Sequence, residues 1–265
     1  MEDTLLHPLD ALRSFRDYRA LRAELAALVR REFAGTSADE SVHEAFSGKI
    51  NFPDAYVLKR LLRRHRPQEV LEVGSFVGFS TRWILEVVSR WNGRVTSVDP
   101  NIRHRSFDAP GDVLQRLNAR FLPANLEVVH GFFGTPGDVY HDYEHCEPKR
   151  SRPFVDELVA SRRKITESWG RKFDFIFIDG DHSYEAVKEN FRISLHLLRP
   201  GGCIAFHDAL SWEGVNDALR EIARDHAGSA DTKILGKLDH RIFQGLLGKH
   251  TDGIGFFQAR RKIAD

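Results

Sequence analysis

From residue 69 onward the chain alternates between short apolar runs and stretches with helical periodicity. The apolar runs are near-continuous, which is typical of strands buried on both faces of a parallel sheet. The intervening stretches repeat apolar residues at the spacing of a helix with one buried face. Strands that alternate with helices in this way predict an α/β fold with a doubly wound, mainly parallel sheet of about seven strands.

The bounds of these elements follow from the apolar pattern and from the glycine and proline residues that interrupt it. The predicted strands are Glu69–Gly74, Arg94–Asp99, Leu126–Gly131, Phe173–Asp179 and Cys203–His207, with a final pair at Lys233–Leu238 and Gly253–Ala259. The predicted helices between them are Ser80–Trp91, Val113–Arg120, Tyr184–Leu198 and Val215–Asp225. Pro200-Gly201-Gly202 follows the third of these helices and favours a stop there.

Two more helices are predicted before the first strand, one in residues 1–35 and one running from Pro53 through Arg64, with a polar loop at Gly35–Ser47 between them. The first carries an apolar stripe that needs a partner, either the domain itself or the second subunit of a homodimer. The stripe consists of Leu9, Leu12, Phe15, Leu21, Leu25 and Leu28. The cations of Lys59–Arg66 are interpreted as favourable charges at a helix C-terminus. We therefore expect an N-terminal helical extension over residues 1–50 and a main domain over residues 51–265.

The stretch at about 132–172 departs from the alternation. Tyr140–Lys164 is charged and has no strand pattern, so we expect a helical or loop insert that acts as a lid or specificity element. His141, His145 and Cys146 suggest a metal site, which we disfavour because no second ligand pair at a known spacing accompanies them.

Composition narrows the class of protein. The chain has 265 residues, of which 42% are hydrophobic and 29% charged, enough for a sizeable core. A net charge of +1 creates no field that recruits nucleic acid or an anionic membrane. Cys146 and Cys203 cannot form a disulfide framework, and neither a signal peptide nor a membrane span is evident. We expect a soluble, cytoplasmic protein.

The first motif with chemical content is Glu69–Thr81, EVLEVGSFVGFST, in which a strand leads through a glycine turn into a helix. Gly74 and Gly78 allow close approach to a ligand, but the dinucleotide fingerprint G-x-G-x-x-G is absent. The turn suits a ligand with an amino-acid end. Asp99 ends the next strand, where a carboxylate either accepts hydrogen bonds from ribose hydroxyls or caps the turn before Pro100.

The second motif is Phe173–Tyr184, FDFIFIDGDHSY, where a buried strand ends in polar groups. Asp179 follows this strand, and His207-Asp208 follow the next one. Since adjacent strands lie about 5 Å apart, Asp179 and Asp208 are placed to bind one divalent cation. His182 is either a base near neutral pH or a solvent-facing loop residue. Asp181 or Ser183 is interpreted as a cap of the following helix.

Together these motifs resemble the class I S-adenosylmethionine-dependent methyltransferases over roughly residues 50–260, which implies a Rossmann-like fold. More narrowly, FIDGDHSYEAVKENF followed by L-x-PGG-x-IAFHD is similar to the macrocin O-methyltransferase and cephalosporin hydroxylase-like group. The arrangement also resembles the cation-dependent catechol-type O-methyltransferases.

The resemblance implies a cofactor site and a metal site. It implies an S-adenosylmethionine site made of Glu72, Gly74, Ser75, Gly78, Ser80, Asp99, Gly131, Phe132 and Asp179. It also implies that Asp179 and Asp208 hold Mg²⁺ or Mn²⁺ and that His182 is the general base. His207 stands where several relatives have an acidic or amide group, and imidazole is a poor ligand for Mg²⁺. His207 therefore either binds a softer ion such as Mn²⁺ or positions substrate or water.

We accordingly expect methyl transfer from S-adenosylmethionine to a hydroxyl of a small molecule, a sugar or a natural product. A nicotinamide-dependent oxidoreductase is an alternative that the glycine spacing disfavours. A non-catalytic, ligand-binding methyltransferase-like protein is disfavoured because both metal aspartates and His182 are present. A metal-dependent hydrolase would leave Glu72 and Asp99 unexplained.

Overall fold

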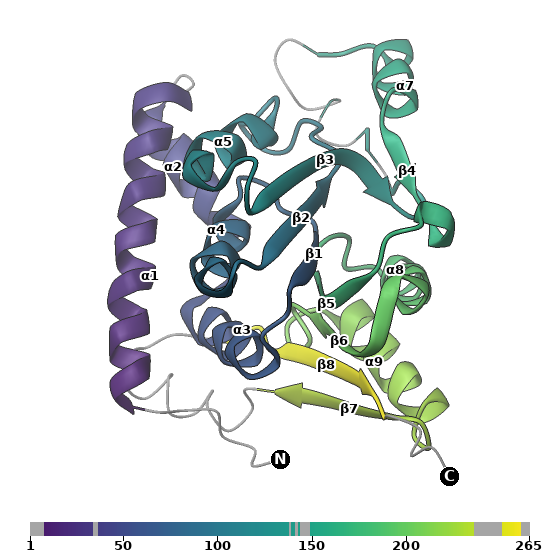
Figure 1. Ribbon diagram of the computed structural model, residues 1–265. Coiled ribbons are helices and arrows are strands. Elements are labelled where there is room, and N and C mark those ends of the chain that lie inside the picture. The colour runs from purple at the N-terminus through teal and green to yellow at the C-terminus, as the bar shows by residue number, and fades with distance from the viewer. Residues whose placement is uncertain are drawn as a thin grey trace.

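The protein is built around one eight-stranded sheet with the strand order β4-β3-β2-β1-β5-β6-β8-β7 (Figure 1). The computed structural model describes residues 8–33, 37–137, 139–140, 143, 149–235 and 251–260. The strands are β1 (Glu69–Val73), β2 (Arg94–Asp99), β3 (Leu126–Phe133), β4 (Arg163–Ile165), β5 (Phe173–Ile178), β6 (Leu198–Phe206), β7 (Ala230–Leu235) and β8 (Ile254–Ala259).

All strand pairs from β4 across to β6 are parallel, and β8 runs antiparallel to both of its neighbours. The predicted doubly wound, mainly parallel sheet is thereby confirmed. The expected number of about seven strands is too low, because β4 extends the edge of the sheet beside β3. This strand lies within the stretch predicted to lack strand pattern. As an edge strand it exposes Arg163 and Lys164, so its sequence carries no apolar run.

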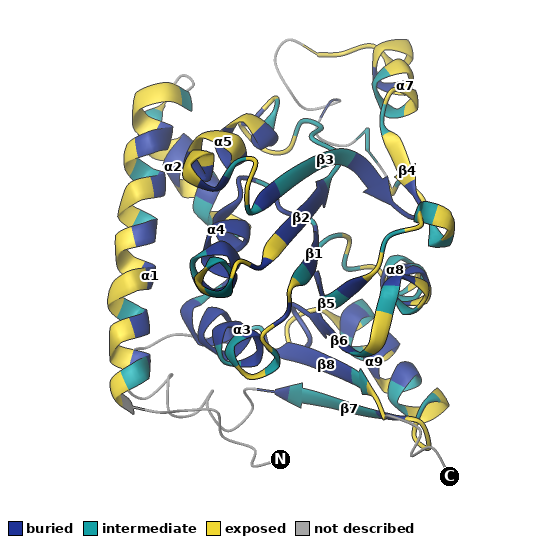
Figure 2. Cartoon of the chain, viewed as in Figure 1, coloured by how far each residue is buried: buried dark blue, intermediate teal, exposed yellow. Residues whose placement is uncertain are grey.

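Helices cover both faces of the sheet (Figure 1). They are α1 (Pro8–Leu28), α2 (Ala38–Ser47), α3 (Phe52–His65), α4 (Phe79–Val88), α5 (Pro110–Leu117), α7 (Arg152–Ala160), α8 (Tyr184–Leu197) and α9 (Glu213–Asp225). One core packs α1, α3, α4 and α5 on one face, and a second packs α8 and α9 on the other. Neighbouring residues of β1 enter different cores, Val70 the first and Leu71 the second. Figure 2 shows the central strands as buried, which explains their near-continuous apolar runs.

The N-terminal helix α1 packs against the outside of the helical layer, but only part of its predicted stripe is buried. Leu21, Leu25 and Leu28 are buried, whereas Leu9 and Leu12 are each 64% exposed. The described part of the chain therefore buries only part of the stripe, and a second subunit that covers Leu9 and Leu12 stays a prediction.

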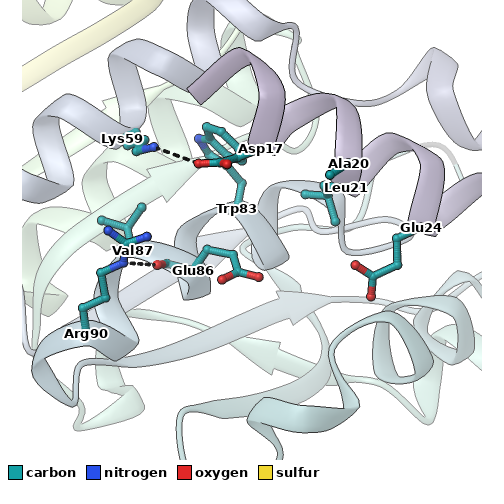
Figure 3. A pocket seen from close by; sticks show the side chains of 9 residues that line it. All are labelled: Asp17, Ala20, Leu21, Glu24, Lys59, Trp83, Glu86, Val87 and Arg90. Atoms are coloured by element: carbon teal, nitrogen blue, oxygen red, sulfur yellow. Dashed lines mark hydrogen bonds and ion pairs between the residues drawn. The ribbon is translucent and has the colours of Figure 1, made fainter. Parts of the chain in front are cut away.

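Three basic residues of α3 contact α1. Arg63 and Arg60 both pair with Asp10, and the Lys59 ammonium donates to the Ser14 hydroxyl at 2.8 Å. Lys59 also lies 3.7 Å from Asp17 beside a crevice of about 290 Å³ between α1, α3 and α4 (Figure 3). Burial lowers the pKa of Lys59. These cations tie two helices together, in addition to any effect at the end of α3.

The polar loop predicted over Gly35–Ser47 is wrong where the structure describes it. Residues 38–47 form α2, and the Ser37 hydroxyl accepts a hydrogen bond from the Glu40 amide at 3.3 Å. Ser37 and Glu40 have the S-x-x-E spacing of a capping box, a helix-start signal that the polar composition of this stretch obscured.

The helical part of the predicted insert is α7, which begins after the N-cap Ser151. His141, His145 and Cys146 lie outside the described residues, as do positions 236–238 of the predicted last strand pair. The pair itself is formed by β7 and β8, with β7 starting three residues before the predicted Lys233. Among the helices that the structure describes, none is long and apolar enough to cross a membrane.

Candidate active site

The order of strands reverses between β1 and β5, and ligands of open α/β sheets bind at the carboxyl ends of strands at such a point. Here the backbones of Gly74 and Asp179 meet. Gly74 has φ +81°, and a Cβ placed on it would lie 2.2 Å from the Asp179 carbonyl oxygen. Only glycine fits this contact.

Asp99 anchors the glycine turn to the tip of β2. Its Oδ2 accepts hydrogen bonds from the amides of Ser75 and Phe76 at 3.1 and 3.0 Å, and its Oδ1 accepts from the Asn101 amide at 2.8 Å. Asp99 therefore caps the turn, which is one of the two roles that the sequence suggested for it. Because a carboxylate oxygen has two lone pairs, Oδ1 can also accept a hydrogen bond from a ligand hydroxyl.

Glu72 lies behind the turn, fully buried in β1. Its Oε2 accepts a hydrogen bond from the Thr81 hydroxyl at 2.5 Å. Burial raises the pKa of Glu72 to about 8, although hydrogen bonds from Ser80 and Thr81 act in the opposite direction. Burial therefore favours the protonated form of Glu72 in the ligand-free protein.

A cavity of about 460 Å³ opens beside the turn, within the range of small-molecule sites, about 300–1,000 Å³. The predicted cofactor residues Gly74, Asp99, Gly131, Phe132 and Asp179 line it. Four other predicted residues do not line the cavity, namely Glu72, Ser75, Gly78 and Ser80.

The donors and contours of this cavity fit a cofactor with an amino-acid end and a nucleoside. Gly74 lines the cavity, and its lack of a Cβ lets the Asp179 backbone pack against the turn. The Ser75 hydroxyl does not line the cavity, and it is buried without a hydrogen-bond partner among the described residues. Asp99 supplies a carboxylate at the cavity wall.

Next to the cavity, two carboxylates and two imidazoles from β5 and β6 form one cluster. The Nδ1 of His207 lies 2.9 Å from Asp179 Oδ1 and 3.2 Å from Asp208 Oδ2. The Nε2 of His182 lies 2.9 Å from Asp208 Oδ2 and 3.9 Å from Asp179 Oδ1. The structure thus brings together all residues that the sequence proposed for metal binding and for the general base.

The four groups change one another's acidity. Burial opposes the charged form of His182, but Asp179 and Asp208 outweigh it and raise its pKa to about 9. Burial likewise opposes the imidazolium of His207, whose pKa the same carboxylates raise well above its usual value. Although burial favours their protonated forms, the histidines hold the pKa values of Asp179 and Asp208 below their ordinary range. Without another cation, the cluster is therefore a set of ion pairs.

Asp181 lies next to this cluster in the sequence, but its side chain hydrogen-bonds to the backbone. Its Oδ1 accepts a hydrogen bond from the Ser183 amide at 2.8 Å. Ser183 is the N-cap of α8, accepting from the Ala186 amide at 3.4 Å. Both residues have the capping role that the sequence suggested.

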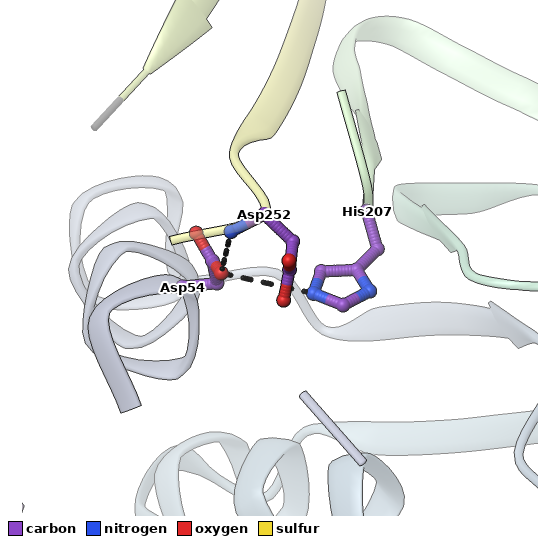
Figure 4. A group of neighbouring side chains, drawn as sticks. All are labelled: Asp54, His207 and Asp252. Atoms are coloured by element: carbon purple, nitrogen blue, oxygen red, sulfur yellow. Dashed lines mark hydrogen bonds and ion pairs between the residues drawn. The ribbon is translucent and has the colours of Figure 1, made fainter. Parts of the chain in front are cut away.

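Three neighbours of the cluster were missed by the sequence analysis. The indole of Trp212 stacks on His182, with ring centroids 4.9 Å apart and planes at 18°. Asp54, in the first turn of α3, and Asp252, before β8, lie on the far side of His207 (Figure 4). Asp54 resembles an ordinary acidic residue at a helix start, so no local signal distinguished it.

The donor set at this cluster fits a divalent cation. Asp179, His207 and Asp208 each offer one ligand atom, and these atoms lie within 4.8 Å of one another. Ligand atoms about 2.1 Å from an octahedral ion lie about 3.0 Å apart at neighbouring corners. The separations of 2.9 and 3.2 Å from His207 Nδ1 match this spacing.

One protein-family model, described as a methyltransferase domain, matches residues 71–209, more than half of the chain. The matched segment begins in β1 and ends directly after Asp208, so it spans the glycine turn and the cluster. A comparison with curated proteins found no match.

Solved structures share the fold. The SAH-bound methyltransferase PaMTH1 of Podospora anserina is 12% identical, with a TM-score of 0.54 over 97% of this chain and 98% of that one. A Staphylococcus aureus protein provisionally designated a caffeoyl-CoA O-methyltransferase is 14% identical, with a TM-score of 0.50 over 90% and 99% of the two chains. At these identities the likeness concerns the fold alone.

Proposed function

The chain belongs to the methyltransferase-domain family and is a class I, S-adenosylmethionine-dependent methyltransferase, and we propose that its acceptor is a hydroxyl oxygen of a small molecule. The observation that carries this proposal is the cluster at the ends of β5 and β6. It combines a cation donor set with a histidine beside a cavity fit for the cofactor. An oxygen nucleophile needs both a means of lowering its pKa and a base, and these residues supply them.

In this proposal the cavity beside Gly74 binds S-adenosylmethionine, which supplies the methyl group on its sulfonium. Gly74 lines this cavity at the turn after β1, which supports binding of the amino-acid end of the cofactor there. Asp99 binds the ribose through its remaining lone pair, and Gly131 and Phe132 border the adenine. These residues hold the two reactants in line, and such positioning supplies much of the acceleration.

Asp179, His207 and Asp208 would hold a divalent cation, Mg²⁺ or Mn²⁺, which when bound would polarise the acceptor hydroxyl and lower its pKa. His182 then accepts the hydroxyl proton at Nε2, the atom that lies 2.9 Å from Asp208. Because Asp179 and Asp208 raise the pKa of His182, this imidazole is a base only where their negative charge is compensated.

The proposal is tested by incubating the purified protein with S-adenosylmethionine, Mn²⁺ or Mg²⁺ and a panel of sugar and catechol hydroxyls. S-Adenosylhomocysteine release is the readout, with an EDTA-treated sample for comparison. We expect acceptor-dependent release that EDTA suppresses. Release that persists in full with EDTA would contradict the role of the cation. Binding of NADH in place of S-adenosylhomocysteine would contradict the cofactor assignment.

A further inference from the structure

His207 lies between two pairs of carboxylates, one on each side of its ring. Its Nδ1 faces Asp179 and Asp208, and its Nε2 lies 3.9 Å from Asp54 Oδ2, with Asp252 beside that carboxylate (Figure 4). The His207 side chain is only 6% exposed, and its Nε2 has no hydrogen-bond partner among the described residues. The proposed ion site accounts for Nδ1 and leaves the surroundings of Nε2 unexplained.

Asp54 is held in place independently of His207. It is fully buried, and its Oδ1 accepts hydrogen bonds from the Thr251 hydroxyl and from the Gly253 amide at 3.0 Å. Its Oδ2 accepts from the Asp252 amide at 2.8 Å. These contacts join α3 to the segment before β8 and fix the Asp54 carboxyl group opposite His207 Nε2.

A carboxylate on one side of an imidazole decides which nitrogen carries the proton. Metal-ligating histidines direct their second ring N–H to such a group, which sets both tautomer and ring orientation. In the structure, the ring nitrogen that hydrogen-bonds a carboxylate is Nδ1, 2.9 Å from Asp179 Oδ1, while Asp54 Oδ2 lies 3.9 Å from Nε2, beyond hydrogen-bond distance. A cation bound at Nδ1 would take the place of the Nδ1 proton, so the proton of a neutral His207 would then lie on Nε2, on the side of the Asp54 carboxylate. The Nδ1 lone pair is then directed at the space between Asp179 and Asp208.

An imidazole donor changes which ion suits the site. Mg²⁺ prefers an all-oxygen shell, whereas Mn²⁺ and the later first-row ions accept nitrogen ligands readily. We propose that Asp54 is a positioning residue for His207, and that the mixed nitrogen and oxygen donor set makes this site select Mn²⁺ over Mg²⁺. This inference rests on the cation site of the proposed function, and it adds a residue and an ion preference that the function itself does not require.

The ion preference is tested on the purified full chain after treatment with EDTA and gel filtration. Titration calorimetry with MnCl₂ and with MgCl₂ is expected to give a dissociation constant at least about tenfold lower for Mn²⁺. Bound Co²⁺ is expected to give a visible absorption spectrum that changes in His207→Asp. In that variant the preference for Mn²⁺ should shrink, because the site gains a third carboxylate. Equal affinities in the unmodified protein, or binding of neither ion, would overturn the inference.

The role of Asp54 is tested with Asp54→Asn and a matched control, Thr251→Val. Both variants weaken the junction between Asp54 and the segment before β8, but only the first alters the group that faces His207. We expect Asp54→Asn to weaken Mn²⁺ binding about 10- to 100-fold and Thr251→Val to leave it unchanged. If both variants lower the affinity equally, or neither does, Asp54 does not position His207.

These outcomes separate the inference from the proposed function. Selective Mn²⁺ binding without methyl transfer to any acceptor would support the inference and weaken the function. Methyl transfer by a protein that binds neither ion would overturn the inference and the role of the cation, and it would leave the S-adenosylmethionine-dependent methyl transfer standing.

Discussion

Gly74 and Asp179 pack backbone against backbone at the centre of the sheet, so that a Cβ on residue 74 would lie 2.2 Å from the Asp179 carbonyl oxygen. This contact joins the glycine turn after β1 to the strand end that carries Asp179. The proposed cofactor and metal sites therefore share a wall, and the shape of one depends on the other.

Gly74→Ala should destabilise the fold and remove cofactor binding. The residue has φ +81° and its neighbour is backbone, which cannot move aside, so we expect a loss of at least about 2 kcal/mol in the free energy of unfolding. Urea denaturation measures the stability, and calorimetry with S-adenosylhomocysteine the binding. Gly228→Ala is the control, because no described atom lies within 4 Å of its added Cβ. Normal cofactor affinity in Gly74→Ala would contradict the close packing.

Glu72 should make stability depend on pH. Burial raises its folded-state pKa to about 8 from an unperturbed value of 4.5. Its favourable contribution is therefore complete below about pH 4.5 and is lost as the pH rises toward 8.

Glu72→Gln removes this titration. Across that window the free energy of unfolding of the unmodified protein should fall, relative to the variant, by up to about 1.4 kcal/mol per pH unit. Urea denaturation of both proteins at a series of pH values measures the difference. Parallel stability curves would show that Glu72 is ionised in the folded protein.

His182→Ala should reduce turnover by about 10²- to 10⁴-fold, the range of general-base catalysis, and leave cofactor affinity nearly unchanged. Turnover should fall because the Nε2 of His182 lies 2.9 Å from Asp208 Oδ2, within the cluster. Cofactor affinity should hold because His182 does not line the cavity. Steady-state kinetics and calorimetry separate the two effects, and His43→Ala, at an exposed position of α2, serves as the control. Lost cofactor affinity with surviving turnover would reverse the assigned roles.

Trp212→Ala should raise the KM for the acceptor and lower kcat. The indole stacks on His182 while 53% of its surface stays exposed, so it both restrains the imidazole and offers a flat apolar face to the acceptor. Trp212→Phe should recover most of the activity, since it preserves the stacking. Kinetics with a fixed excess of S-adenosylmethionine provide the comparison. Equal activity of the alanine and phenylalanine variants would mean that stacking has no role.

Much of this fold was predictable because its signals are local. The bounds of β2 agree with the prediction, and those of β1, β5 and α8 differ from it by one residue at one end. Strands buried on both faces need near-continuous apolar runs, and the ends of helices are marked in the sequence by capping residues, glycine or proline. The placement of Asp179 and His207-Asp208 at neighbouring strand ends followed from the same patterns.

Other elements lacked a strong local signal. The edge strand β4 is three residues long and largely exposed, so hydrophobic burial did not shape its sequence. The helix α2 was hidden by polar composition even though Ser37 and Glu40 marked its start.

What only the tertiary structure decided is which distant residues meet around the cluster. Asp54 accepts a hydrogen bond from Asp252, 198 positions away, and both lie behind His207. Trp212 reaches His182 from the start of α9. Sequence periodicity records which face of an element is buried and where the element ends. It does not record which buried polar groups become neighbours, because that depends on how the helices and loops pack against one another.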